Sequence, residues 1–168
     1  MMKYLKYLPF VLLVGVLIAN AESDLFVSHA AEKNGMAVTE AWSRARPANA
    51  AVGGAFMTIH NMESEADSLV AASSPIADRV EVHNSVMKDG VMSMMHMEKL
   101  LIPSGEMIAL KPGGFHIMLM GLKKPLAKGT EFPVTLKFAR AGEITVTVQV
   151  KDAGAMDMDM HNQKHKHN

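Results

Sequence analysis

Residues Glu143–Val150 read EITVTVQV, and this stretch decides the fold class of the chain. Its apolar side chains recur at every second position, which is the period of a β-strand with one buried face. The dipeptide Ala141-Gly142 stands just before it and predicts a hairpin to a strand over Pro133–Phe138. We therefore expect an antiparallel strand pair near the end of the folded region.

Similar short runs, bounded by turn residues, extend from this pair toward the N-terminus. No segment longer than a turn or two shows a period of 3.6 residues, so the sequence predicts no substantial helix. Many short strands separated by turn residues are typical of an all-β sandwich or barrel. The other predicted strands are Ala37–Arg44, Ala51–His60, Ser68–Ala72, Arg79–Val86, Met92–Lys99, Met107–Leu110 and Phe115–Leu122.

The first 21 residues have the three parts of a secretory signal peptide. Lys3 and Lys6 give a positive start, Leu8–Ile18 is apolar, and Ala19-Asn20-Ala21 fits the small-residue cleavage pattern. The apolar run is shorter than the roughly 20 residues that span a bilayer. We expect a cleaved signal at 1–21, export to the periplasm and no stable membrane insertion afterwards. A linker over 22–35, a folded domain over 36–152 and a tail over 153–168 complete the predicted organisation.

Charge and cysteine content exclude two classes of protein. Loss of residues 1–21 would remove two lysines and leave 15 basic against 17 acidic residues. This near-neutral balance lacks the excess of basic residues that is typical of nucleic-acid-binding proteins. The chain has no cysteine, which is the residue that a lipoprotein anchor requires. The domain must therefore be stabilised by its core alone, without disulfides.

Methionine and histidine concentrate in one stretch, HNSVMKDGVMSMMHMEKLLIPSGEMIALKPGGFHIMLM, from His83 to Met120. It holds three histidines and eight methionines. Thioether sulfur is a soft ligand that favours Cu(I), and imidazole suits copper, zinc, iron or nickel. A mixed set without thiolate points to copper ahead of zinc.

A predicted hairpin brings some of these side chains together. Asp89-Gly90 between two apolar runs is a strong hairpin signal, and a two-residue loop pairs residues whose numbers sum to 179. His83 then faces His96, and His83 and Met94 form a diagonal pair roughly 7–8 Å apart. Met87 and Met92 are expected on the same face.

The segment Phe115–Met120 alternates in the same way. His116 and Met118 share one face, and Phe115, Ile117 and Leu119 share the other, which we expect to pack in the core. The remaining methionines of the region are predicted to be core filler: Met87, Met95, Met97, Met107 and Met120.

The spacing H-x10-M-x21-H-x-M, with the run KPGGFHIMLMGLKKPL, resembles the periplasmic copper chaperones called PCuAC over about residues 36–151. This resemblance implies a cupredoxin-like (immunoglobulin-like) β-sandwich that binds one Cu(I) through His83, Met94, His116 and Met118. It further implies copper delivery to the dinuclear copper centre of cytochrome c oxidase. We also expect the protein to be a monomer. The implied partners are oxidase subunit II or a thioredoxin-like copper assembly factor. His96 departs from the pattern and adds a spare imidazole near the site.

The end of the chain, MDMDMHNQKHKHN from Met156, has no branched aliphatic or aromatic residue to bury, so we predict a disordered tail. Short histidine-rich tracts commonly bind metals. The tail is therefore predicted to be an auxiliary copper-binding arm, taking Cu(II) through its imidazoles. Its candidate ligands are Met156, Met158, Met160, His161, His165 and His167.

Four other functions are compared with copper delivery. A copper-buffering or resistance protein would use the same residues, with more weight on the tail. A copper redox protein of the blue-copper type needs a cysteine thiolate, and the chain has none. No H-E-x-x-H or Ser-His-Asp pattern indicates hydrolysis, so we do not expect an enzyme. A plain adhesion-type sandwich would leave the histidine and methionine spacing unexplained.

Overall fold

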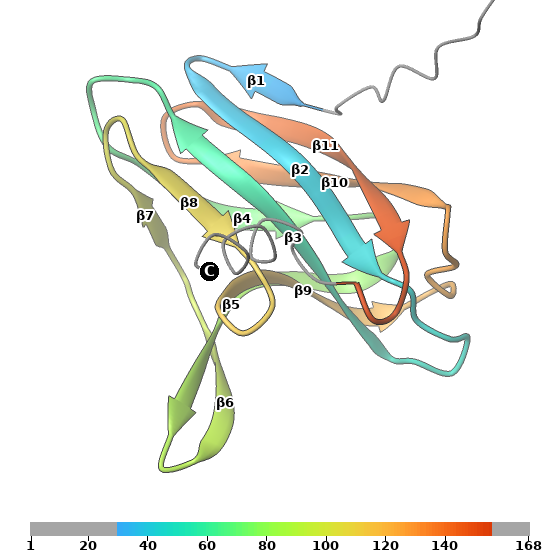
Figure 1. Ribbon diagram of the computed structural model, residues 1–168. Helices are drawn as coiled ribbons and strands as arrows, with labels where there is room; N and C mark the ends of the chain where they lie inside the picture. Colours follow the sequence, from blue (N-terminus) through green and yellow to red (C-terminus); the bar gives the residue numbers. More distant parts are fainter. Residues whose placement is uncertain (1–29, 156–168) are drawn as a thin grey trace, which may run out of the picture.

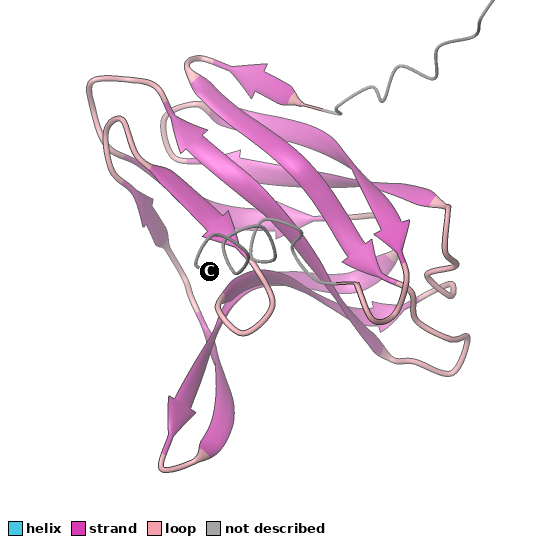
Figure 2. Ribbon diagram, in the orientation of Figure 1, coloured by secondary structure: helices cyan, strands magenta, loops and turns pink. Residues whose placement is uncertain are grey.

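The computed structural model describes residues 30–155, and these residues form strands, turns and loops without any helix (Figures 1 and 2). None of them forms a helix long and apolar enough to cross a membrane. The strands are β1 Ala31–Lys33, β2 Met36–Arg44, β3 Val52–Asn61, β4 Asp67–Ser73, β5 Ala77–Lys88, β6 Val91–His96, β7 Leu100–Ile102, β8 Met107–Leu110, β9 Phe115–Leu122, β10 Glu131–Phe138 and β11 Gly142–Lys151.

The strands pair in the order β6-β5-β9-β3-β2-β11-β10-β4-β7, with β1 added to β2 and β8 added to β3. All pairings are antiparallel except the parallel pairing of β11 with β2. Strands β3, β2 and β11 lie between β9 and β10 in this order, yet the buried side chains of β9 and β10 belong to one hydrophobic core. The paired strands therefore bend back on themselves and form two packed layers. The prediction of an all-β sandwich is confirmed.

The β10–β11 hairpin supplies one side of the core, as the alternation of EITVTVQV predicts. Val146 lies opposite Val134, and Ile144 lies opposite Leu136. All four side chains are at most 4% exposed. On β9 the prediction is also confirmed, because Ile117 and Leu119 are fully buried within the same core.

Two short strands differ from the sequence prediction. Strand β1 pairs with β2 and lies inside residues 22–35, which were expected to be a linker. Strand β7 pairs with β4, in a region where the sequence predicts no strand. Both strands have three residues, which is too short for a period of two to be recognised. The predicted signal peptide and the predicted tail ligands lie outside the described residues.

Hydrogen bonds to the Asp67 carboxylate connect the start of β4 to the β10–β11 turn. Its carboxylate accepts hydrogen bonds from the backbone N–H groups of Arg140 (3.0 Å), Ala141 (2.9 Å) and its neighbour Ser68 (2.6 Å). Burial by itself would raise the pKa of Asp67, but these donors and the Arg140 charge outweigh it and lower the pKa. The fold is therefore stabilised by the ionised form.

We predict that Asp67→Asn lowers the free energy of unfolding at pH 7 by about 1–3 kcal/mol, because hydrogen bonds to a charged acceptor are lost. The stabilisation by ionised Asp67 is present above its unfolded pKa of about 4 and is lost as pH falls through the lower folded pKa. The difference between wild type and variant, measured by urea unfolding from pH 7 to pH 2.5, should therefore shrink below about pH 4. Asp152→Asn, which breaks the exposed pair with Lys128, should cost less than about 1 kcal/mol at any pH. A difference independent of pH would contradict the role of the charge.

Candidate metal centre

The β5–β6 hairpin projects from the sandwich and presents one half of the predicted site (Figure 1). Its two turn residues, Asp89 and Gly90, have φ values of 53° and 78°. Positive φ at both positions is what a type I′ turn requires, and this turn matches the twist of the two strands. The pairs His83–His96 and Lys88–Val91 follow, so the predicted register is confirmed.

Three histidines form a row across strands β6, β5 and β9. His83 lies opposite His96 on one side and opposite His116 on the other. The ring centroids are 5.8 Å apart in the first pair and 5.9 Å apart in the second. Directly opposed residues share one face of a sheet, so the three imidazoles emerge on the same side.

The two predicted thioether ligands lie on the diagonals of this row. Met94 is paired with Ser85, two residues along β5 from His83, and Met118 is paired with Glu81, two residues along in the other direction. Met94, Met118 and His116 line one open cavity of about 460 Å³. His83 adjoins His116 but is not among the residues that line this cavity.

His116 is held in the tautomer that leaves one nitrogen free for a metal. Its Nδ1 lies 3.0 Å from the carbonyl oxygen of Gly114, and because a carbonyl only accepts, Nδ1 carries the proton. Nε2 then keeps the lone pair. The side chain is 95% shielded, and burial is the main cause that lowers the pKa of His116, with a smaller contribution from His83. The imidazole is therefore neutral at neutral pH, as metal binding requires.

In His83, as in His116, one ring nitrogen lies beside a protein oxygen that accepts a hydrogen bond. Its Nε2 lies 2.8 Å from Oε2 of Glu81, and the hydrogen bond from His83 is the main cause that lowers the pKa of Glu81. The carboxylate accepts from Nε2, so in the neutral imidazole that binds a metal Nδ1 has the lone pair. That Nδ1 is buried and has no hydrogen-bond partner among the described residues. An unpaired buried acceptor is costly, and a bound metal ion would satisfy it.

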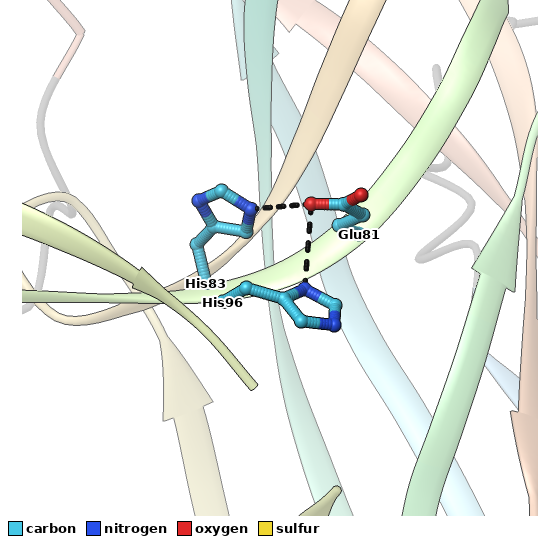
Figure 3. A group of neighbouring side chains, drawn as sticks. All are labelled: Glu81, His83 and His96. Atoms are coloured by element: carbon cyan, nitrogen blue, oxygen red, sulfur yellow. Dashed lines mark hydrogen bonds and ion pairs between the residues drawn. The ribbon is translucent and has the colours of Figure 1, made fainter. Parts of the chain in front are cut away.

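Glu81 is a site residue that the sequence prediction missed. It stands two residues before His83 and therefore emerges on the same face, a parity that could have identified it. Its Oε2 lies 3.3 Å from Nδ1 of His96, and its Oε1 lies 3.1 Å from Nε of Arg79. Figure 3 shows one carboxylate oxygen of Glu81 directed at both imidazoles, those of His83 and His96.

The methionines of this region are more exposed than core packing would allow. Met87 is 66% exposed, Met95 is 53% exposed and Met107 is 65% exposed, so the prediction that these three are core filler is wrong. The hairpin carries Met87 and Met95 beyond the sandwich, where no second layer covers them, whereas Met107 is the exposed first residue of β8. Met92, on the face of Met94, lines the same cavity and is a further candidate thioether.

Comparison with known proteins identifies the family of this fold. A family model described as "Putative lipoprotein LpqE-like" matches residues 36–150. The chain belongs to the LpqE-like family. A Leifsonia xyli subsp. xyli protein named "Putative lipoprotein Lxx21020" is 38% identical over 122 residues, which cover 72% of each chain. An uncharacterised protein of Rickettsia prowazekii is 31% identical over 96 residues, covering 56% of this chain and 53% of that protein.

Solved structures with the same fold include copper-binding proteins. The copper-bound PCuAC domain from PmoF2 is 22% identical with a TM-score of 0.64, over 74% of this chain and 98% of that domain. The Cu(I) form of DR1885 from Deinococcus radiodurans, solved in solution, is 29% identical with a TM-score of 0.57, over 73% of this chain and 80% of that protein. The cupredoxin-like sandwich expected for this chain is thus the fold of PCuAC domains.

We predict that Gly90→Val weakens Cu(I) binding because it disturbs the hairpin that presents Met94. A side chain at Gly90 would meet no atom within 4 Å, so the strain, roughly 1–2 kcal/mol, comes from the positive φ alone. Gly105→Val is the matched control, since Gly105 has a φ of 71°, has no atom near its added Cβ and lies outside the hairpin. Both variants should lose similar stability, and only Gly90→Val should speed amide exchange in β6 and lower Cu(I) affinity. Equal copper affinity in the two variants would contradict a role for the hairpin.

Proposed function

We propose that this protein is an exported copper carrier that holds one Cu(I) through His83, Met94, His116 and Met118 and passes it to a recipient protein. The observation that supports this most is the protonation pattern of the two histidines. Each has one ring nitrogen beside a protein oxygen that only accepts, so in the neutral ring the other nitrogen has the lone pair, and for His83 that nitrogen has no hydrogen-bond partner among residues 30–155. Such outer partners are typical of histidines that bind metals.

The ligand chemistry favours the monovalent ion. Two neutral imidazoles and two thioethers add no negative charge, and thioether sulfur is selective for Cu(I) among the biological metals. Met94 is 53% exposed and the cavity is open, so an incoming ligand can reach the bound ion. A carrier needs this access, because transfer proceeds by replacing one ligand at a time.

The known relatives support copper as the cargo. DR1885, which is 29% identical to this chain, was solved with Cu(I), and a PCuAC domain with the same fold was solved with copper. The lipoprotein description of the family, and the start of the sequence, support export to the periplasm. Binding and transfer, rather than catalysis, is the role that these likenesses favour.

The recipient is proposed from the resemblance to PCuAC chaperones. It is the dinuclear copper centre of cytochrome c oxidase, reached through oxidase subunit II or a thioredoxin-like copper assembly factor. Incubation of the Cu(I)-loaded protein with an apo dinuclear-copper domain should move copper to that domain, seen by its visible absorption after oxidation. If copper stays on the carrier at equal concentrations, buffering is the better description.

The tail is proposed to add copper-binding capacity beside the folded site. Ala153 lines the cavity, and the carbonyl oxygen of Ala155 accepts a 2.8 Å hydrogen bond from Nε of Arg44. Ala155, the last described residue, therefore lies beside a residue that lines the cavity.

We predict that Met94→Leu combined with Met118→Leu lowers Cu(I) affinity at least about tenfold and removes the sulfur neighbours seen by X-ray absorption, because only soft thioethers distinguish the site for Cu(I). The fold should persist, since leucine conserves the volume of methionine. The matched control is Met95→Leu combined with Met107→Leu, two exposed methionines that do not line the cavity. An unchanged Cu(I) affinity in the first pair, measured with a competing chelator, would refute the ligand assignment.

We predict that truncation after Ala155 lowers the number of copper ions bound per chain but leaves the Cu(I) affinity of the folded site within about threefold. The reason is that the tail ligands are separate from the four ligands on the sandwich. Stoichiometry is read by metal analysis after gel filtration. A truncated protein with the full copper count would show that the tail binds none.

A further inference from the structure

A second group of metal-ligand side chains lies beside the proposed Cu(I) site and contains no sulfur. The nearest ligand atoms of Glu81, His83 and His96 all lie within 4.8 Å of one another. Oε2 of Glu81 is 2.8 Å from Nε2 of His83 and 3.3 Å from Nδ1 of His96 (Figure 3). Two strands in fixed register hold the three residues, because His83 lies directly opposite His96 and Glu81 is two residues along β5.

These separations match the requirements of one small ion. An ion bound roughly 2.1 Å from each of three ligand atoms at tetrahedral angles keeps those atoms roughly 3.4 Å apart. The two distances to Oε2 of Glu81, 2.8 Å and 3.3 Å, lie near that spacing, and rotamer adjustments of the side chains would complete it. The strands themselves need not move.

We propose that Glu81, His83 and His96 form a second metal site, for a divalent ion, and that this site binds Cu(II) in preference to Zn(II). Two imidazole nitrogens and one carboxylate oxygen are borderline-to-hard ligands, unlike the thioethers of the neighbouring set. Among divalent first-row ions, a given nitrogen and oxygen site binds Cu(II) most tightly. The fold would thus offer a different ligand set to each oxidation state of copper.

The surroundings of Glu81 leave this site available. Arg79 pairs with Oε1, while Oε2 is directed at both imidazoles, so one oxygen can bind an ion while the arginine keeps the other. The His96 side chain is 50% exposed, which gives an ion access from solvent and leaves positions for water ligands.

His83 belongs to both ligand sets, so the Cu(I) site and the divalent site cannot be occupied at the same time. A neutral imidazole has a proton on one nitrogen and a lone pair on the other. When Nε2 donates to Glu81, the lone pair is on Nδ1 and serves Cu(I). When Nε2 binds a divalent ion together with Glu81, the proton must move to Nδ1. This exclusion, unlike the divalent site itself, rests on the proposed Cu(I) function.

The test uses residues 22–168 with His161, His165 and His167 changed to Gln, so that the tail adds no imidazole. Titration with Cu(II) against a weak chelator should give one bound ion, whose paramagnetic resonance spectrum shows two nitrogen neighbours. In this background, His96→Gln and Glu81→Gln should each lower Cu(II) affinity at least about tenfold, because each removes one ligand. His60→Gln, a histidine on β3 outside the cluster, is the control and should change nothing.

The result that overturns the second site is wild-type Cu(II) affinity and an unchanged spectrum in both His96→Gln and Glu81→Gln. His96→Gln should leave Cu(I) affinity unchanged, and the Met94→Leu, Met118→Leu pair should keep its Cu(II) affinity. Failure of this proposal and failure of the Cu(I) site are therefore seen in different variants.

Exclusion is tested with Zn(II), which undergoes no redox reaction with the bound copper. Prior loading with one Cu(I) under anaerobic conditions should weaken Zn(II) binding at least about tenfold. Equal Zn(II) affinity with and without Cu(I) would refute a shared His83.

Discussion

The pairing of β5 with β9 in a single register is the constraint on which both the core and the candidate metal centre depend. In that register Val82 lies opposite Ile117, and both are buried; one residue further along, His83 lies opposite His116. Side chains alternate between the two faces of a sheet, so the same ladder packs the core on one face and assembles the ligands on the other. A slip of one residue would place imidazoles in the core and valine in the candidate metal centre. The hydrophobic core thus fixes the position of the ligands.

The hydrogen bonds around the histidines determine which metal chemistry the ladder can support. The Gly114 carbonyl and the Glu81 carboxylate each hold a proton on one ring nitrogen, which directs the lone pair of the other. Burial keeps His116 neutral by lowering its pKa. With neutral nitrogen donors beside thioethers, the arrangement suits an ion of low charge. Glu81 adds a negative charge beside Nε2 of His83, the ring nitrogen that is not proposed to bind Cu(I). A divalent ion would require such a negatively charged ligand.

The projecting hairpin explains why so many methionines are exposed. A two-stranded ribbon has no second layer to cover it, so all six residues of β6 are exposed. Thioethers at a surface are poor core residues but accessible ligands, and methionine adapts its shape to varied partners. The same exposure that would make Met94 available to the proposed copper ion would also make it available to the ligands of the proposed recipient. A carrier with a fully enclosed site would bind well and release slowly.

The sequence by itself determined the strand pattern, the β5–β6 register and the parity of the candidate ligands. It could do so because alternation and a two-residue turn are local properties, readable within a dozen residues. Only the tertiary structure decided that His116 stands opposite His83, that the Glu81 carboxylate contacts both His83 and His96, and that no second layer covers the methionines of the hairpin. Strands β5 and β9 are joined through β6, β7 and β8, so no single turn fixes their register, and the packing of the whole core has to do so. The surroundings of His83 depend on the same long-range pairing, because β9, unlike β6, does not follow β5 directly in the chain.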